Sequence, residues 1–506
     1  TLRQTGVEED ANDLAAEVEA GKSKPKLDTG KLSKPGGNTM ELEERNTGAV
    51  DMFVWKAYLR AGKAMVLVPL AFIFACCMQA STTLTTYWLN WWAEWNITGE
   101  HSMGFSLGLY IMLGVMQFIF NFIADILLGL MTYFASRKLH DNAMKRVMYS
   151  PMAWFDTTPI GRIINRFGKD IDVLDNQVSG LLRQSVATFM TMLGAGAMII
   201  ALTYYFAIVI VGVLLISWFI STYYRASSRE FKRVDALLRS TLYSHFAESL
   251  TGLTTIRAYN ESKRFLYENY KAMDLQNRAY FLTIVNRRWL GLRLDLLGSL
   301  CVLVVGILAA VRVHGMGAGQ SGVVLSMMIT IAQSLSMLTS ELTELENEMN
   351  SAERLVYYAE TLDQEAPQQI PDTKPPASWP DHGAIDLDNL WLKYRPNLPN
   401  VLKGVTLHVN GGEKVGIVGR TGAGKSSILT VLLRLSEATQ GTISIDGINV
   451  SMIGLEDLRL AIAILPQEPL LFSGTLRSNL DPFGLYDDAR LWDAMQRAYL
   501  TGPTSA

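Results

Sequence analysis

Residues 414–427 read KVGIVGRTGAGKSS. Within them, residues 419–426 match the spacing G-x-x-x-x-G-K-[ST], in which glycines let backbone N–H groups curl around phosphate oxygens. A β-branched run at 414–418 precedes this loop, and an apolar run at 427–435 follows it. Strand, glycine-rich loop and helix in this order predict a P-loop that binds a nucleoside triphosphate at a helix N-terminus.

The residue types in the loop predict which atoms meet the nucleotide. The Lys425 ammonium is suited to neutralise the β- and γ-phosphates, and the Ser426 hydroxyl is suited to ligate Mg²⁺. We therefore expect ATP and Mg²⁺ as cofactors. The residues expected to contact ATP are Gly419, Thr421, Gly422, Ala423, Gly424, Lys425, Ser426 and Ser427.

Two further residues are candidates for the same site. Tyr394 is either a tyrosine at a strand edge or an aromatic platform for a nucleobase. Gln467 leaves an apolar run, and its amide is a candidate to reach Mg²⁺ and an attacking water. Sequence alone leaves both alternatives open.

The P-loop lies in a region with the pattern of a soluble α/β domain, residues 384–506. A proline-rich polar linker at residues 360–383 precedes it. Short β-branched runs predict strands at 384–387, 405–409, 414–418, 442–445 and 461–465.

The rest of the composition is that of a membrane protein. Hydrophobic residues make up 49% of the chain and charged residues 18%, which excludes an ordinary soluble enzyme and a disordered protein. A net charge of −3 gives no indication of nucleic acid as a partner. Six apolar runs are long enough to span a bilayer within a transmembrane domain at 49–359. They lie at about 64–93, 104–134, 181–203, 205–224, 289–313 and 320–340.

Lysine and arginine near the span ends predict the orientation. They cluster before the first span, after the second and fourth, and before the fifth, whereas the other connections hold only Arg312. Both chain ends and two long loops are therefore predicted to be cytosolic. The outer side then carries a sequon at Asn96, a candidate glycosylation site. Residues 1–48 are polar and charged and predict a disordered cytosolic linker.

The two long loops, residues 135–180 and 225–288, are predicted to be helical extensions of the spans. Glycine and proline interrupt each extension once, as a chain reversal requires. The predicted fold class is a polytopic α-helical membrane domain with long cytosolic arms, joined to part of an α/β P-loop NTPase domain.

Six spans with such arms, joined to a P-loop region on one chain, resemble an ATP-binding cassette (ABC) exporter. Glu353-Arg354 after the last span and Lys393-Tyr394-Arg395 are similar to the C subfamily, the multidrug-resistance-associated group. The segment LRSNLDPFG at 476–484 resembles the second nucleotide-binding domain of that group. The likeness is greatest to fungal full-length multidrug exporters of the oligomycin-resistance type.

This resemblance implies roles for residues in both regions. It implies that Tyr394 stacks on adenine and that Gln467, the Q-loop glutamine, acts in catalysis with Lys425 and helps to hold Mg²⁺. It also implies that Trp289 and Arg293 line a substrate cavity for amphipathic anions. The residues implied to couple the membrane domain to nucleotide-binding domains are Phe155, Asp156, Pro159, Gly161 and Gly252.

The sequence also departs from the family pattern. It ends at Ala506 without an LSGGQ-type signature, a Walker B acidic pair or a switch histidine, and it begins at Thr1 without a first membrane domain. We therefore expect a fragment, truncated within the second nucleotide-binding domain, that does not hydrolyse ATP alone. Its expected partners are membrane lipid, the missing N-terminal half and a small amphipathic or anionic substrate.

Two functions follow from the resemblance. The first is ATP-driven export of amphipathic drugs or organic conjugates, in the plasma membrane rather than the vacuolar membrane. The alternative is an ATP-gated channel or a channel-regulating subunit of the same subfamily. Substrate-stimulated ATP hydrolysis would distinguish an exporter from a channel, which would show ATP-gated conductance instead.

Overall fold

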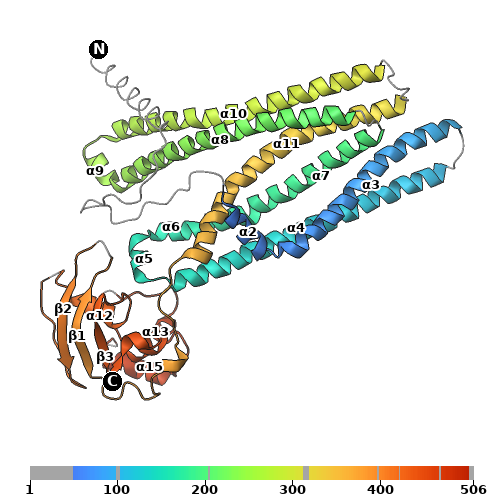
Figure 1. Ribbon diagram of the computed structural model, residues 1–506. Coiled ribbons are helices and arrows are strands. Elements are labelled where there is room, and N and C mark those ends of the chain that lie inside the picture. Colours follow the sequence, from blue (N-terminus) through green and yellow to red (C-terminus); the bar gives the residue numbers. More distant parts are fainter. Residues whose placement is uncertain are drawn as a thin grey trace, which may run out of the picture. The chain divides into compact units, whose positions relative to one another are not determined.

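A computed structural model describes residues 50–98, 103–202, 206–310, 318–395, 398–420, 422–465 and 469–500. The predicted linker at residues 1–48 lies outside the described residues. The chain forms two compact units. The first runs to Met148 and again from Trp154 to Leu362, and the second contains Tyr149–Ala153 and the chain from Asp363 onwards (Figure 1).

Within the described residues, the first unit has six helices long and apolar enough to cross a membrane, which confirms the predicted spans. Short helices and π-helical segments join them. The elements in chain order are α2 (Met52–Ala61), α3 (Ala64–Thr98), α4 (Met103–Met148), α5 (Met152–Thr157), α6 (Ile160–Asn165), η1 (Arg166–Asp170), η2 (Val173–Val178), α7 (Ser179–Leu202), α8 (Phe206–Thr251), α9 (Leu253–Ala258), α10 (Ser262–Ala310), α11 (Ala318–Val356) and η4 (Tyr357–Thr361).

The predicted arms are present as continuations of the spanning helices. Helix α4 continues to Met148, α8 continues to Thr251, and α10 begins at Ser262, well before its predicted span. With 49 residues, α10 is ~74 Å long, more than twice the roughly 30 Å of a hydrocarbon core. Helices α8 and α10 run side by side and are joined through the short α9 (Figure 1).

Helix α2 is amphipathic and packs on the membrane unit by one face. The Asp51 carboxylate caps its N-terminus by accepting a hydrogen bond from the Phe53 N–H at 2.9 Å. Val54 and Tyr58 are buried against α4 and α11 in the largest apolar cluster, and Tyr58 is 1% exposed. Because Met52 and Phe53 remain exposed, the other face of α2 is left to solvent or lipid.

One buried carboxylate ties α11 to the segment before α7. Asp170 is 2% exposed, and its Oδ2 accepts hydrogen bonds from Arg354 Nε at 2.9 Å and Arg166 Nη1 at 3.0 Å. Arg354 also donates to Asp170 Oδ1 and to the Ser351 hydroxyl. Since a buried charge is costly unless it is paired, this cluster makes the register between the two helices specific.

The described sheet of the second unit is a small antiparallel one with the strand order β2-β1-β3-β4. Apolar side chains of this sheet and of the helix after the P-loop form one core, which includes Leu390, Leu392 and Val431. The elements are η5 (Pro371–Thr373), β1 (Ile385–Leu392), β2 (Leu402–Val409), α12 (Lys425–Leu432), β3 (Gln440–Ile445), β4 (Ile448–Asn449), η6 (Val450–Met452), α13 (Leu455–Ala461), α14 (Leu476–Leu480) and α15 (Asp488–Arg497).

Two of the five predicted strands are wrong in this structure. Residues 414–418 are extended chain without strand pairing, and at 461–465 the helix α13 ends at Ala461 and no strand follows. Val418 is 98% exposed and Leu465 is 96% exposed. A strand with apolar side chains on both faces needs a neighbouring strand to bond its N–H and C=O groups. No such neighbour lies beside these segments among the described residues.

The proline-rich linker after Leu362 follows the second unit closely. The Pro367 and Gln368 carbonyls accept hydrogen bonds from the first N–H groups of α13, at 3.2 and 2.9 Å. The Asp446 carboxylate accepts three backbone N–H bonds from residues 382–384, at 2.8–3.0 Å. The N–H groups of Gly383 and His382 hold the pKa of Asp446 below its usual range, because they stabilise the ionised carboxylate.

Close contact between α10 and α11 predicts a strong effect of a small substitution. A Cβ added at Gly298 would overlap the Cβ of Ala332 on α11. We therefore predict that Gly298→Ala destabilises the membrane unit by about 1–3 kcal/mol, because the two helices have to separate. The measurement is thermal unfolding of the full-length protein in detergent, followed by size-exclusion chromatography.

Two other glycines on the same helix are matched controls. A Cβ at Gly291 or Gly306 meets nothing within 4 Å. Alanine at these positions should leave the unfolding temperature unchanged or raise it, because alanine favours a helix by about 1 kcal/mol over glycine. If the unfolding temperature fell equally in the alanine variants of Gly298, Gly291 and Gly306, the close contact at Gly298 would be contradicted.

Candidate functional site: a phosphate-binding loop

Glycines shape the loop before α12. Gly422 and Gly424 have φ angles of 82° and 91°, in the left-handed region that residues with a Cβ rarely adopt. A Cβ at Gly424 would also lie 3.3 Å from the Leu402 side chain and 3.4 Å from the Val401 carbonyl oxygen. These two glycines therefore let the chain reverse tightly into the first turn of α12, as a P-loop requires.

The Lys425 side chain folds back over the loop that precedes it. Its Nζ donates to the Gly419 carbonyl oxygen at 2.6 Å and to the Arg420 carbonyl oxygen at 3.0 Å. The Ala423 N–H donates to the Arg420 carbonyl oxygen at 3.1 Å, and this hydrogen bond closes the turn. In the described part of the chain these neutral carbonyls are the partners of the ammonium, so its full positive charge is left for an anion. A triphosphate, whose oxygens accept hydrogen bonds, fits this ammonium and the N–H groups at the start of α12.

The structure brings Tyr394 to the same helix. Its hydroxyl donates to the Ser427 Oγ at 2.9 Å, and Ser427 is buried in the first turn of α12. The Tyr394 ring is half-buried against the apolar core of the second unit. Stacking on a nucleobase therefore stays a prediction, and the hydroxyl has a structural partner that sequence did not indicate. Thr421 and Gln467 lie outside the described residues.

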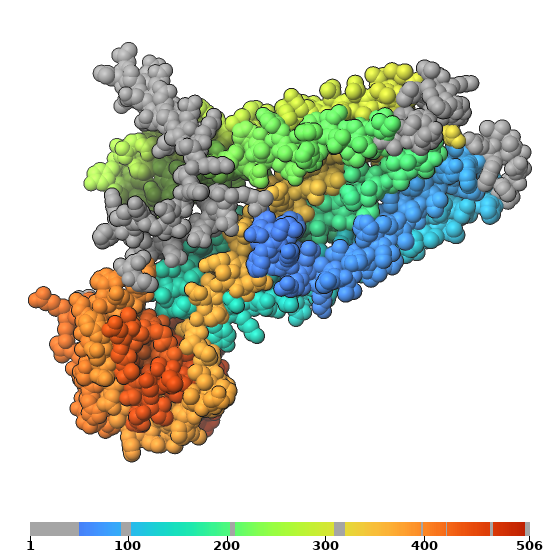
Figure 2. Space-filling view, in the orientation of Figure 1, coloured from blue at the N-terminus to red at the C-terminus, as the bar shows by residue number. Residues whose placement is uncertain are grey.

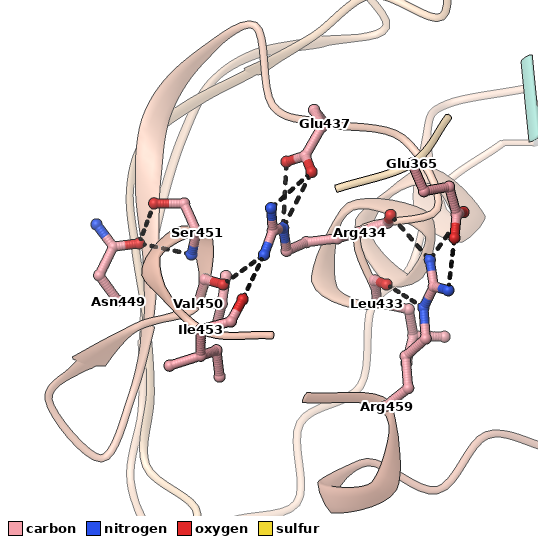
Figure 3. A network of polar contacts seen from close by, with 9 residues as sticks. All are labelled: Glu365, Leu433, Arg434, Glu437, Asn449, Val450, Ser451, Ile453 and Arg459. Carbon is pink, nitrogen blue, oxygen red and sulfur yellow. Dashed lines mark hydrogen bonds and ion pairs between the residues drawn. The ribbon is translucent and has the colours of Figure 1, made fainter. Parts of the chain in front are cut away.

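Two arginines hold the other end of α12 (Figure 3). Arg459 of α13 donates to the Leu433 and Arg434 carbonyl oxygens, both at 3.2 Å, where α12 ends. The Glu365 carboxylate holds Arg459 through two bonds of 2.8 and 3.0 Å. Cations at a helix C-terminus satisfy its free carbonyls and complement its dipole. The linker residue Glu365 thus fixes the helix that carries the P-loop.

Arg434, which follows the end of α12, makes further contacts in the same network. It is 8% exposed and donates through Nη1 to the Val450 and Ile453 carbonyl oxygens, both at 3.0 Å. Glu437 binds the other side of the guanidinium, with Nη2 donating to Oε1 at 2.8 Å. Sequence reasoning missed Arg434 and Arg459 because the Val450 and Ile453 carbonyls and the Glu365 carboxylate that they bind are distant along the chain.

The predicted substrate residues of the membrane unit do lie together. The Arg293 guanidinium lies 4.0 Å from the Trp289 ring centroid, and the Tyr223 ring of α8 lies 5.6 Å from the same ring. Leu290 and Leu294 beside them are fully buried. The guanidinium is exposed and stacks on an aromatic face, an arrangement that can present it to an organic anion.

The predicted coupling residues lie at the breaks in the arms. Phe155 packs against the Trp154 ring at 4.9 Å between centroids, and Asp156 is exposed in α5. Pro159 is the residue before α6, Gly161 lies in its first turn, and Gly252 separates α8 from α9. Asn96 lies in the last turn of α3, and its side chain is outside the described set.

A buried carboxylate in α11 was not predicted. Glu341 is 6% exposed, and its Oε1 accepts a hydrogen bond from the Thr188 hydroxyl of α7 at 3.3 Å. Its Oε2 has no hydrogen-bond partner among the described residues. An ionisable residue at membrane depth is a functional candidate. The predicted sixth span, at about 320–340, ends directly before Glu341.

Comparison with known proteins agrees with both units. Residues 66–336 match the family of the ABC transporter transmembrane region, and residues 402–505 match the ABC transporter family. The ABC-type transporter cicA of Emericella nidulans is 43% identical over 460 residues, which are 90% of this chain and 33% of that protein.

Two other relatives are named for resistance to toxic compounds. The multidrug resistance protein fer6 of Mycosarcoma maydis is 39% identical over 465 residues, 91% of this chain and 35% of that protein. The oligomycin resistance ATP-dependent permease YOR1 of Saccharomyces cerevisiae is 39% identical over 464 residues, 91% of this chain and 31% of that protein. The chain thus spans about one third of the length of these relatives.

The network at the end of α12 predicts a local effect of losing Arg459. Arg459→Met leaves the Glu365 carboxylate and two helix carbonyls without their partner, at a cost of about 2 kcal/mol. Amide hydrogen exchange in residues 428–435 should become roughly 30-fold faster. Arg497→Met is the control, since Arg497 is 79% exposed and its exchange pattern should not change. Unchanged exchange in the Arg459 variant would contradict the capping role.

Two variants separate the ring of Tyr394 from its hydroxyl. Tyr394→Phe loses the bond to Ser427 but should bind ATP within about twofold of the native affinity. Tyr394→Ala should weaken ATP binding by about 1–3 kcal/mol if the ring stacks on the base. Inorganic triphosphate, which has no base, is the control ligand and should bind both variants equally. If Tyr394→Ala bound ATP with the native affinity, stacking of the ring on the base would be disproved.

Proposed function

The chain belongs to the ATP-binding cassette transporter family, and we propose that the full-length protein is an ATP-driven exporter of amphipathic drugs or organic anions. One observation carries this proposal: a membrane unit with six spanning helices and a P-loop lie on the same chain. Relatives named for multidrug and oligomycin resistance support drugs as the cargo.

The nucleotide end of the mechanism is assigned to residues of the loop. Lys425 exchanges its carbonyl partners for the β- and γ-phosphates, and Tyr394 supports the adenine ring. The Ser426 hydroxyl and the Gln467 amide would hold Mg²⁺, which would neutralise charge on the phosphates. Binding energy from ATP favours one arrangement of the nucleotide-binding domains and thereby shifts the membrane domain between two states.

The membrane end of the mechanism is assigned to Trp289 and Arg293. A guanidinium that stacks on an indole presents an apolar face and two parallel donors, which suits a ring that carries a carboxylate or sulfate. The breaks at Pro159 and Gly252 transmit movement to the nucleotide-binding domains. Both ends of the chain are proposed to be cytosolic, and the plasma membrane is the proposed location.

Replacing the P-loop lysine tests the proposal. Lys425→Ala in the full-length protein should weaken ATP binding on the order of 10- to 100-fold, because a charge-assisted contact is lost. ATP-dependent uptake of a fluorescent drug into inside-out vesicles should fall to the level without ATP. Lys403→Ala is the control, since Lys403 is an exposed strand residue of the same unit.

Two results would overturn the exporter assignment. One is uptake by the Lys425 variant at the native rate. The other is ATP-gated ion conductance in planar bilayers without drug-stimulated ATP hydrolysis, which would assign the protein to channels instead.

A further inference from the structure

We infer that a polar groove between α8 and η1 is a binding site for organic anions, separate from the Trp289–Arg293 pair. The groove has a volume of about 630 Å³, within the roughly 300–1,000 Å³ of small-molecule sites. Its lining residues include Lys169 of η1 and, on α8, Asp235, Arg239, Ser240, Tyr243 and Ser244. The α8 residues are spread over about half of the helix circumference, on the side that includes Arg239 and Tyr243.

The hydrogen-bond donors and acceptors of the groove define the class of ligand that it can bind. Its carboxylate, Asp235, is already bonded twice: Oδ2 accepts from Arg239 Nη2 at 2.7 Å, and Oδ1 accepts from Gln276 Nε2 of α10 at 2.7 Å. Lys169 has three N–H donors with no hydrogen-bond partner among the described residues, and Arg239 has N–H groups beside the one bonded to Asp235. The Ser244 hydroxyl donates to Glu248 Oε1 at 3.4 Å. Donors therefore exceed acceptors, and the fitting ligand is rich in acceptors.

The charges of the groove also favour an anionic ligand. Among the residues that line the groove, Lys169 and Arg239 are cations and Asp235 is a carboxylate, so the lining carries one net positive charge. The Tyr243 side chain, which is 64% exposed, offers a ring face for an aromatic ligand. Carboxylates, sulfates and phosphates attached to a ring meet both conditions.

The position along α8 places the groove outside the hydrocarbon. The predicted fourth span ends at residue 224, so residues 235–244 lie ~17–30 Å further along the helix axis. Water-soluble anions reach such a position without crossing lipid. The groove is thus placed to bind an anion before it reaches the membrane core, a role that rests on the proposed export function.

Equilibrium binding tests the site in the full-length protein without ATP. Carboxyfluorescein, an aromatic anion, is the probe, and fluorescence anisotropy gives its Kd. The double variant Lys169→Gln with Arg239→Gln should raise Kd at least tenfold. Arg233→Gln is the matched control, because Arg233 lies on the same helix, is 66% exposed and pairs with Glu230. An unchanged Kd in the double variant overturns the proposal.

Cysteine protection tests the location without removing a charge. The background is the full-length protein with all cysteines replaced, including Cys76, Cys77 and Cys301. Ser240→Cys lies in the groove, and Thr241→Cys lies at the next position, which is exposed and does not line the groove. Carboxyfluorescein should slow modification by a charged thiol reagent at 240 and not at 241. A cationic rhodamine of similar size should protect neither. Equal rates at 240 with and without carboxyfluorescein overturn the site.

These measurements separate the site from the export function. Binding and protection are read without ATP, so they do not require transport. Vesicles that bind carboxyfluorescein through Lys169 and Arg239 but take up no drug with ATP would disprove export and leave the site standing. Drug uptake with an unchanged Kd in the double variant would disprove the site and leave export standing.

Discussion

In hydrocarbon, each backbone N–H and C=O group must be bonded within the chain, and the membrane unit follows from this constraint. The spanning helices are uninterrupted where they are most apolar, and hydroxyl side chains inside them bond to their own helix, as Thr85 does to the Ser81 carbonyl at 2.8 Å. The chain reverses at residues 149–160 and 252–262, outside the predicted spans, where water can bond free backbone groups. The spanning helices therefore continue beyond the predicted spans as long arms.

Because the arms extend beyond the predicted spans, their faces can carry charge, and charge makes their packing specific. Arg354 and Arg166 on Asp170 join α11 to η1. Helix α8 presents Arg239, whose side chain is 47% exposed, to an open groove, whereas the side chain of its partner Asp235 is only 13% exposed. A helix that faces lipid cannot expose charged side chains in this way, because an unpaired charge there is costly. Anion recognition in the arms is therefore compatible with the membrane fold in a way that it is not in the spans.

Local patterns were predictable from sequence, and long-range pairing was not. Six apolar runs and the G-x-x-x-x-G-K-S spacing each lie in one short segment, and both appear in the structure. The strands expected at 414–418 and 461–465 depend on neighbouring strands, which no local pattern encodes. Glu365 and Arg459 are distant in sequence, and so are Lys169 and Arg239, which line the same groove, so composition and spacing could not pair them.

The two ends of α12 connect the P-loop to the rest of the chain. Lys425 at its start holds the loop, and Arg459 at its end is bound by Glu365. The first unit ends at Leu362, and two residues, Asp363 and Gln364, lie between it and this anchor. The three residue steps from Leu362 to Glu365 span at most ~11 Å when fully extended. A displacement of Leu362 that would stretch this link beyond that length must either break the Glu365–Arg459 pair or move α12. The link from the membrane unit to the helix that carries the P-loop is thus covalent and short.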